Sequence, residues 1–308
     1  MNLMNQSNNI SVLPFYRSID EQDSRRNYAY GEKYPLYTPI GSVPPFQIVR
    51  KHNAATVTAA TLFRADRTMK ADILASLRTA GLKVKQYADY NYDIVVFPSI
   101  GQMNITTEEG MYYIRLRMSD GTLYYSDIFT VSSITSGFLM LQWWDRDDLV
   151  MENGRIAYID ENDEVDFRNT LWLNTQLGKP DYEFEEQGET RDGYFFPEKM
   201  ISEKVYKCNF LAPEYLCDVM RLIRLSDYVV LVDQYGNTYR CDTFLCTPKW
   251  QEQGNLANVE VEFTCNTVVK KIGKAYIDTV TDDDFNIDFN NDFDIMVEEN
   301  DVVVEENE

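Results

Sequence analysis

Segments in which apolar and polar side chains alternate recur along most of this chain. Two clear examples are MYYIRLRM at 111–118 and NVEVEFT at 258–264. Successive side chains of a strand point to opposite faces, so a period of two is typical of strands with one buried face. The 21 Tyr and 16 Phe, set against 14 Gly, also favour strands. The sequence therefore predicts a mainly β protein.

The length of 308 residues exceeds what one ordinary core accommodates and predicts two or three domains. A β-sandwich of the immunoglobulin or fibronectin type III kind is expected at 44–132, where several short strand patterns follow one another. The Cys, Trp and Cys pattern of antibody domains is missing there. A hairpin turn is predicted at Ser119-Asp120-Gly121-Thr122. A second, antiparallel β-rich domain is expected at 133–274.

The second domain is expected to contain one packed helix, over about 214–225. Pro213 and Glu214 suit a helix start, and apolar side chains follow at a spacing of three to four residues. The stretch 68–80 is also compatible with a short helix. The segment from Pro180 to Pro197 is polar, acidic and interrupted by glycine, and it is interpreted as a long loop reaching away from the sheet.

Both ends of the chain are expected to be extended arms that contact other subunits. Residues 1–43 combine prolines and aromatics without a helical period, and packing of this arm on its own body is the alternative. Residues 275–308 alternate apolar with acidic side chains, as a strand does that adds to a sheet edge. For this tail, disorder and docking on its own subunit are the alternatives. The residues predicted to contact partners are Phe15, Tyr16, Tyr34, Tyr37, Phe285, Ile287, Phe289, Phe293 and Ile295.

The formal net charge is -21, and the acidic excess is strongest beyond Lys274, where no Lys or Arg occurs. Proteins that bind nucleic acid present a basic surface, so nucleic-acid binding is not expected. The N-terminus lacks a basic segment followed by an apolar one, and no apolar run is long enough to span a membrane. Synthesis in the cytoplasm without membrane insertion is therefore expected.

Few side chains suit catalysis or metal binding. His52 is the only histidine and is interpreted as a surface residue. The five cysteines lack C-x-x-C spacing and are interpreted as buried, reduced thiols. Aspartates at 282–294 suit calcium, but no glycine is present to make an EF-hand loop. No nucleotide, zinc-protease or serine-hydrolase motif occurs. No catalytic residue, cofactor or metal site is predicted, although sequence spacing leaves a glycosidase carboxylate pair open.

Adjacent Trp143 and Trp144 are predicted to point to opposite faces of one strand. The outward ring is interpreted as an interface anchor or a plug between domains, because Trp is common at the centres of protein interfaces. A platform for stacking sugars is the alternative.

The block from Phe167 to Gly273, which begins FRNTLWLNTQLGKPDYEFEEQGETRDGYFFPEKM, resembles a family of structural proteins from tailed bacteriophages and prophages of gut Bacteroidetes. The resemblance extends to LPFYRSIDEQDSRRNYAYGEKYPLYTPIGSVPPFQIVR and EGMYYIRLRMSDGTLYYSDIFTV. It covers most of the chain up to Gly273. Members of this family are virion or tail components and not enzymes, so the resemblance implies a virion location.

The resemblance implies a non-enzymatic structural component of a tailed-phage virion, in first place a tail, distal-tail or baseplate subunit. Such a subunit would assemble as a symmetric oligomer through its extended termini, with copies of itself and with other phage structural proteins. One alternative is an adsorption module that binds a glycan or protein of the host surface, for which the polar segment 188–194 is a candidate. A head–tail connector or neck subunit is the other.

Overall fold

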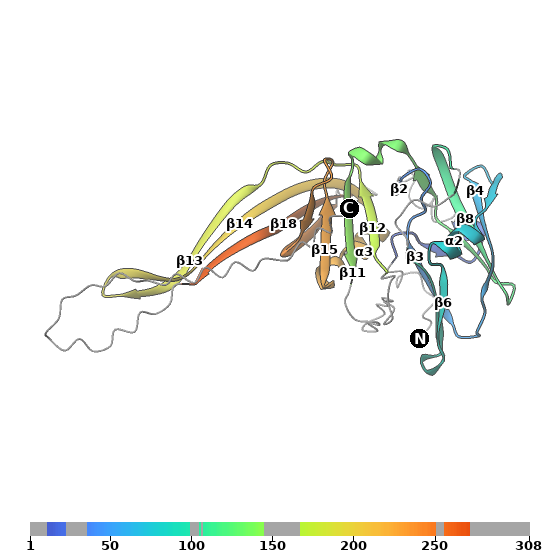
Figure 1. Ribbon diagram of the computed structural model, residues 1–308, viewed down its shortest axis with the longest axis horizontal. Coiled ribbons are helices and arrows are strands. Elements are labelled where there is room, and N and C mark those ends of the chain that lie inside the picture. Colours follow the sequence, from blue (N-terminus) through green and yellow to red (C-terminus); the bar gives the residue numbers. More distant parts are fainter. Residues whose placement is uncertain are drawn as a thin grey trace, which may run out of the picture.

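The computed structural model describes residues 11–22, 36–98, 105, 107–144, 167–250 and 256–271. Within these residues the protein is mainly β, which confirms the expected fold class. The described strands form three sheets. Two of the sheets build a body, and the third extends from it as a long projection (Figure 1).

The largest sheet contains eleven of the described strands. They are β1 Phe15–Tyr16, β2 Leu36–Thr38, β4 Val57–Arg64, β5 Met69–Asp72, β8 Gly110–Met118, β9 Leu123–Ser126, β10 Phe129–Val131, β11 Leu139–Trp144, β12 Asn169–Leu173, β15 Tyr228–Val232 and β16 Thr238–Arg240. The hydrogen-bonded order is β1-β9-β8-β10-β2-β12-β11-β15-β16, and β4 joins β8 and β5. Neighbours run antiparallel, except that β10 and β2 run parallel.

A second sheet has the order β3-β7-β6 and lies against the first. Its strands are β3 Phe46–Lys51, β6 Lys83–Tyr87 and β7 Tyr92–Phe97, and the helix α2 Leu74–Thr79 precedes β6. Side chains from the two sheets share one core, which explains why β7 is buried along its whole length. The strands of the 44–132 region thus form two layers over a common core, as in a sandwich. The turn predicted at 119–122 does connect β8 with β9, with Gly121 at a φ of 84°.

The third sheet has the order β13-β14-β18-β17. Its strands are β13 Asp181–Arg191, β14 Tyr194–Pro213, β17 Thr243–Trp250 and β18 Leu256–Lys271. The helix α3 Glu214–Met220 follows β14 directly, and the 3-10 turn η4 Ile223–Leu225 comes next. The helix predicted from about 214 is therefore present but ends at Met220, before the separate turn at 223–225, and the predicted apolar face is buried.

The main sheet crosses both of the boundaries expected near residues 43 and 132. Strand β2 lies between β10 and β12, and β1 pairs with β9. Segments assigned to the arm and to both domains therefore share one sheet. The alternation of side chains identifies strands, but it does not specify which strands are neighbours.

The segment from Pro180 to Pro197 is not a loop, and that prediction was wrong. It forms β13, a two-residue turn and the first residues of β14. The acidic composition and Gly188 favoured a loop interpretation, yet acidic side chains are stable on a strand that is solvated on both faces. Over residues 68–80 the structure has strand β5 followed by the short, six-residue helix α2.

Candidate functional site: a projecting hairpin

Residues 181–204, here called the hairpin, form the outer part of the projection (Figure 1). Strand β13 pairs with β14 from Asp181 opposite Val205 to Arg191 opposite Tyr194. Every residue of β13 is exposed. Strand β14 is longer and continues into the body, where it pairs with β18 as far as Pro213. The hairpin is therefore held at one end and solvated at the other.

A tight turn closes the hairpin. Asp192 has a φ of 50° and Gly193 a φ of 84°. Two consecutive residues with positive φ match a type I′ turn, whose twist fits a two-stranded hairpin and which favours Asp-Gly or Asn-Gly. This dipeptide, flanked by strand patterns, was the signal by which the sequence could have revealed the hairpin.

A bulge near the tip requires a glycine. The register between β13 and β14 shifts between Gln187 and Gly188. A Cβ atom on Gly188 would lie 2.0 Å from the carbonyl oxygen of Phe196, which is far inside van der Waals contact. A bulge bends a strand and increases its twist. The bend of the hairpin thus depends on the missing side chain at residue 188.

Large apolar side chains are exposed on the hairpin and beside it. The exposed fractions are 74% for Tyr182, 63% for Phe184, 72% for Tyr194, 48% for Phe195 and 52% for Phe196, and Val268 on neighbouring β18 reaches 61%. Because Phe195 and Phe196 are consecutive on a strand, they point to opposite faces. Concentrated apolar exposure marks contact sites on soluble proteins, so this region is the strongest candidate for binding another molecule.

The same sheet is well packed where it enters the body. The ring of Tyr206 stacks on Phe263 with centroids 5.2 Å apart, and Tyr239 lies 5.1 Å from Tyr206. Phe263, Val259 and Ala257 are fully buried. The base of β14 and β18 is thus a core element, and it gives the exposed end a firm support.

The structure places three of the predicted N-terminal contact residues on the body of the same chain. Tyr16 is 7% exposed and pairs with Tyr125 in β9. The ring of Phe15 lies 4.7 Å from that of Phe46. Tyr37 is half-buried and meets Phe138 edge-on at 4.9 Å. These side chains pack within one chain, as the alternative for the arm expected.

The remaining predicted contact residues lie outside the described residues. They are Tyr34 in the N-terminal arm and Phe285, Ile287, Phe289, Phe293 and Ile295 in the acidic tail.

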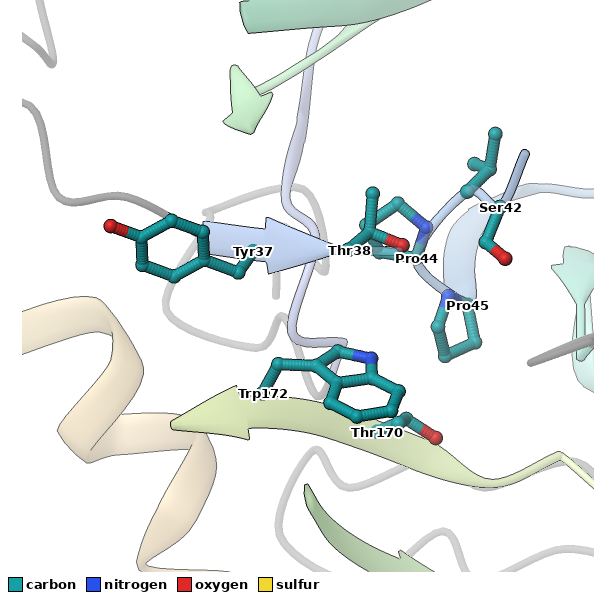
Figure 2. A pocket seen from close by; sticks show the side chains of 8 residues that line it. Tyr37, Thr38, Ser42, Pro44, Pro45, Thr170 and Trp172 are labelled. Atoms are coloured by element: carbon teal, nitrogen blue, oxygen red, sulfur yellow. The ribbon is translucent and has the colours of Figure 1, made fainter. Parts of the chain in front are cut away.

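A small hollow separates residues 37–45 from β12 (Figure 2). Its lining includes Tyr37, Pro44, Pro45 and Trp172. The open space is about 10 Å³, roughly what one water molecule occupies. This hollow is too small for a substrate or cofactor.

A charged cluster around the buried Arg50 lies at the edge of the second sheet. Arg50 is 5% exposed and forms an ion pair with Asp120, and its Nη2 donates to Asn53 Oδ1 at 2.8 Å. Partial burial opposes ionisation of Asp120, but hydrogen bonds from Thr122, then from Arg50 and Asn53, outweigh it and hold the pKa of Asp120 well below its usual range. The cluster stabilises the turn that connects β8 with β9, which is the hairpin turn predicted at 119–122.

His52 belongs to the same neighbourhood. Its Nδ1 lies 2.6 Å from Oδ1 of Asp93, which is fully buried. The side chain of His52 is 26% exposed, so the residue is half-buried and paired, in contrast to the surface position predicted for it. The carboxylate of Asp93 orients the imidazole of His52. Neither residue lines the small hollow beside β12 (Figure 2).

The five cysteines are free thiols, and four of them are half-buried while Cys265 is buried. Burial raises the pKa of Cys208 and of Cys246 to about 12 and that of Cys217 to about 11. The thiolate is the nucleophilic form, so these thiols are unreactive near neutral pH. They act as small apolar side chains around the base of the projection.

Trp143 and Trp144 point to opposite faces of β11, as predicted. Trp143 is 2% exposed, whereas Trp144 stacks on Tyr228 with centroids 5.2 Å apart. The guanidinium of Arg168 lies 4.3 Å from the Trp144 ring centre. The outward ring is therefore engaged within the chain by aromatic and cation–π contacts.

Among the described residues, no group of three or more His, Cys, Asp or Glu side chains is arranged to hold a metal ion. In that part of the chain, no helix combines the length and the apolar character needed to cross a membrane. Comparison with protein-family models, curated proteins and solved structures finds no match to this chain.

Proposed function

We propose that this chain is a non-enzymatic structural subunit of a tailed-phage particle, in the tail or at its distal end, and that it assembles with copies of itself and with other virion proteins. One observation carries the proposal: the hairpin presents large apolar side chains far from the body, on a rigid base, with no core of its own. The sequence resemblance supplies the phage setting. A neck or connector position fits the same observation.

The assembly role is tested by removing the apolar contacts and leaving the fold intact. In the variant Phe195→Ser/Phe196→Ser, the native mass measured by analytical ultracentrifugation should fall from that of an oligomer to that of a monomer. The side chains are about half exposed, so the melting temperature of the body should change little. Tyr235→Ser is the matched control, because Tyr235 is 81% exposed and lies outside the hairpin. An unchanged oligomer in the hairpin variant would contradict the role of the tip.

The second candidate is an adsorption module for a host-surface glycan. It is favoured by Tyr182 and Tyr194, whose rings are 74% and 72% exposed and accessible for stacking on sugars. Binding of purified host capsular polysaccharide, measured by calorimetry, separates the two candidates. Heat of binding that disappears with Tyr194→Ser in a monomeric chain would favour adsorption over assembly.

A further inference from the structure

The two edges of the outer part of the projecting sheet have opposite charge. Strand β13 is at one edge of the sheet and pairs only with β14 among the described strands. Five of its eleven side chains are acidic: Asp181, Glu183, Glu185, Glu186 and Glu189. On the other side, β18 continues past its last pair with β17 at Thr264 and ends in Lys270-Lys271. In this outer part the only described strand beside β18 is β14.

Between the acidic and the basic edge, each face of the sheet carries two apolar side chains in a row of three residues. Phe184 lies opposite Ser202, and Ser202 lies opposite Val268, so these residues form a row across one face. Glu185, Ile201 and Val269 form the next row, on the other face. Phe184 and Val268 are both more than 60% exposed. A neighbouring sheet placed alongside would continue these rows and cover apolar surface on both faces.

We propose that the acidic strand β13 of one copy lies alongside the basic outer end of β18 in the next copy. This rests on the proposed function, namely that the chain assembles with copies of itself. An exposed strand edge such as β13 is a ready site for association with another chain. Charge decides which side it meets: β13 against β13 would place carboxylates together, and β18 against β18 would place lysines together. Like charges facing each other disfavour association, whereas the mixed contact is complementary.

The mixed contact fixes the kind of symmetry. Because both β13 and β18 are antiparallel to β14, they run in the same direction. A rotation axis parallel to the hairpin brings β13 of one copy beside β18 of the next with all tips pointing one way. Such a contact uses two different surfaces of each subunit, so it generates a ring where the rotation closes, and not a two-fold dimer. The hairpins then form the wall of that ring.

Charge reversal in the full chain tests the contact. Glu185→Lys/Glu186→Lys makes β13 less acidic, and Lys270→Glu/Lys271→Glu reverses the other side. Each variant alone should raise the midpoint concentration for assembly, measured by ultracentrifugation, by about tenfold or more. Asp89→Lys reverses an exposed charge on the body and should leave the midpoint unchanged.

Two further samples identify the pairing. The chain that carries all four substitutions should assemble again, because both sides are reversed together. A mixture of the two double variants should form an oligomer in which they alternate. If the wild-type chain forms an oligomer and both double variants assemble at the same midpoint concentration as the wild type, the contact is overturned and the assembly role stays in place. A wild-type chain that is monomeric at every concentration would also overturn the contact, and assembly would then require another virion protein.

Discussion

Three residues, Gly188, Asp192 and Gly193, determine the shape of the hairpin. Gly188 allows β14 to approach within a distance that any side chain would block. Asp192 and Gly193 both have positive φ, which only a few residue types adopt at low cost. The acidic strand therefore depends on two short sites, at residue 188 and at the turn.

Replacing Gly188 with Ala should disturb the hairpin locally. The new Cβ would lie 2.0 Å from the Phe196 carbonyl oxygen, so the bulge must open, at a cost of about 1–3 kcal/mol. Hydrogen exchange of the amides from 183 to 201 should accelerate while that of β11 stays slow. Gly178→Ala is the control, since a Cβ there meets nothing within 4 Å. Equal exchange in both variants would show that the bulge adapts without strain.

Asp120 should make the body sensitive to acid. Its pKa in the folded chain is lowered, so its contribution to stability is present above the unfolded pKa of about 4 and is lost as the pH falls below it. The Asp120→Asn variant should be less stable at pH 7 and should lose less stability than wild type between pH 5 and pH 2. Urea unfolding at several pH values measures this. Asp89→Asn, at an exposed carboxylate, should follow the wild type.

At the scale of elements, one strand has two different environments. The inner half of β14 lies in the core with β18, and its outer half is solvated. Buried and exposed side chains alternate in the inner half but not in the outer half, YFFPEKMISE. For this reason the sequence predicted strands such as 258–264 but not the hairpin. Whether an alternating strand is covered depends on the element that lies against it, which a local pattern does not contain. The burial of the α3 face was predictable because apolar side chains there repeat every three to four residues. For Trp143 and Trp144 the sequence predicted opposite faces, but it did not identify which ring is buried.

Substitutions at the buried base and at the exposed tip of this sheet should therefore change the free energy of unfolding by very different amounts. Phe263→Ala removes a fully buried ring stacked on Tyr206 and should lower the free energy of unfolding by about 3–5 kcal/mol. Phe195→Ala, near the tip, should change it by about 0.5 kcal/mol or less. Denaturant unfolding of the two variants measures both values. Similar losses would mean that the hairpin tip packs against the body.

At the scale of the whole molecule, the sheets join segments that the sequence assigned to separate units. Strands β1 and β2 connect the N-terminal segment to the body, so the described part of this segment belongs to the fold. The contacts predicted for the acidic tail remain a prediction from sequence. The candidate site lies instead in a segment that composition alone assigned to a loop.

Ending the chain after Lys274 should reduce assembly if the tail contacts a neighbour, because Phe285, Ile287, Phe289, Phe293 and Ile295 are then removed. The native mass should fall while the circular dichroism of the β body is retained. The same loss of mass is expected when only the tail phenylalanines are replaced with Ser. If the shortened chain and the full chain have the same subunit number, the tail is not required for assembly.

The length of β14 has a mechanical consequence. A strand of 20 residues spans roughly 65 Å, and this one runs without interruption from the tip to the buried base. A force that pulls on the tip along the strand loads many of the hydrogen bonds between β14 and β18 together, on both sides of the register shift between Ser202 and Lys204, since the ladder lies parallel to the force. A force across the strand would instead open the ladder one bond at a time. The projection should therefore resist a pull along its axis more strongly than a pull across it.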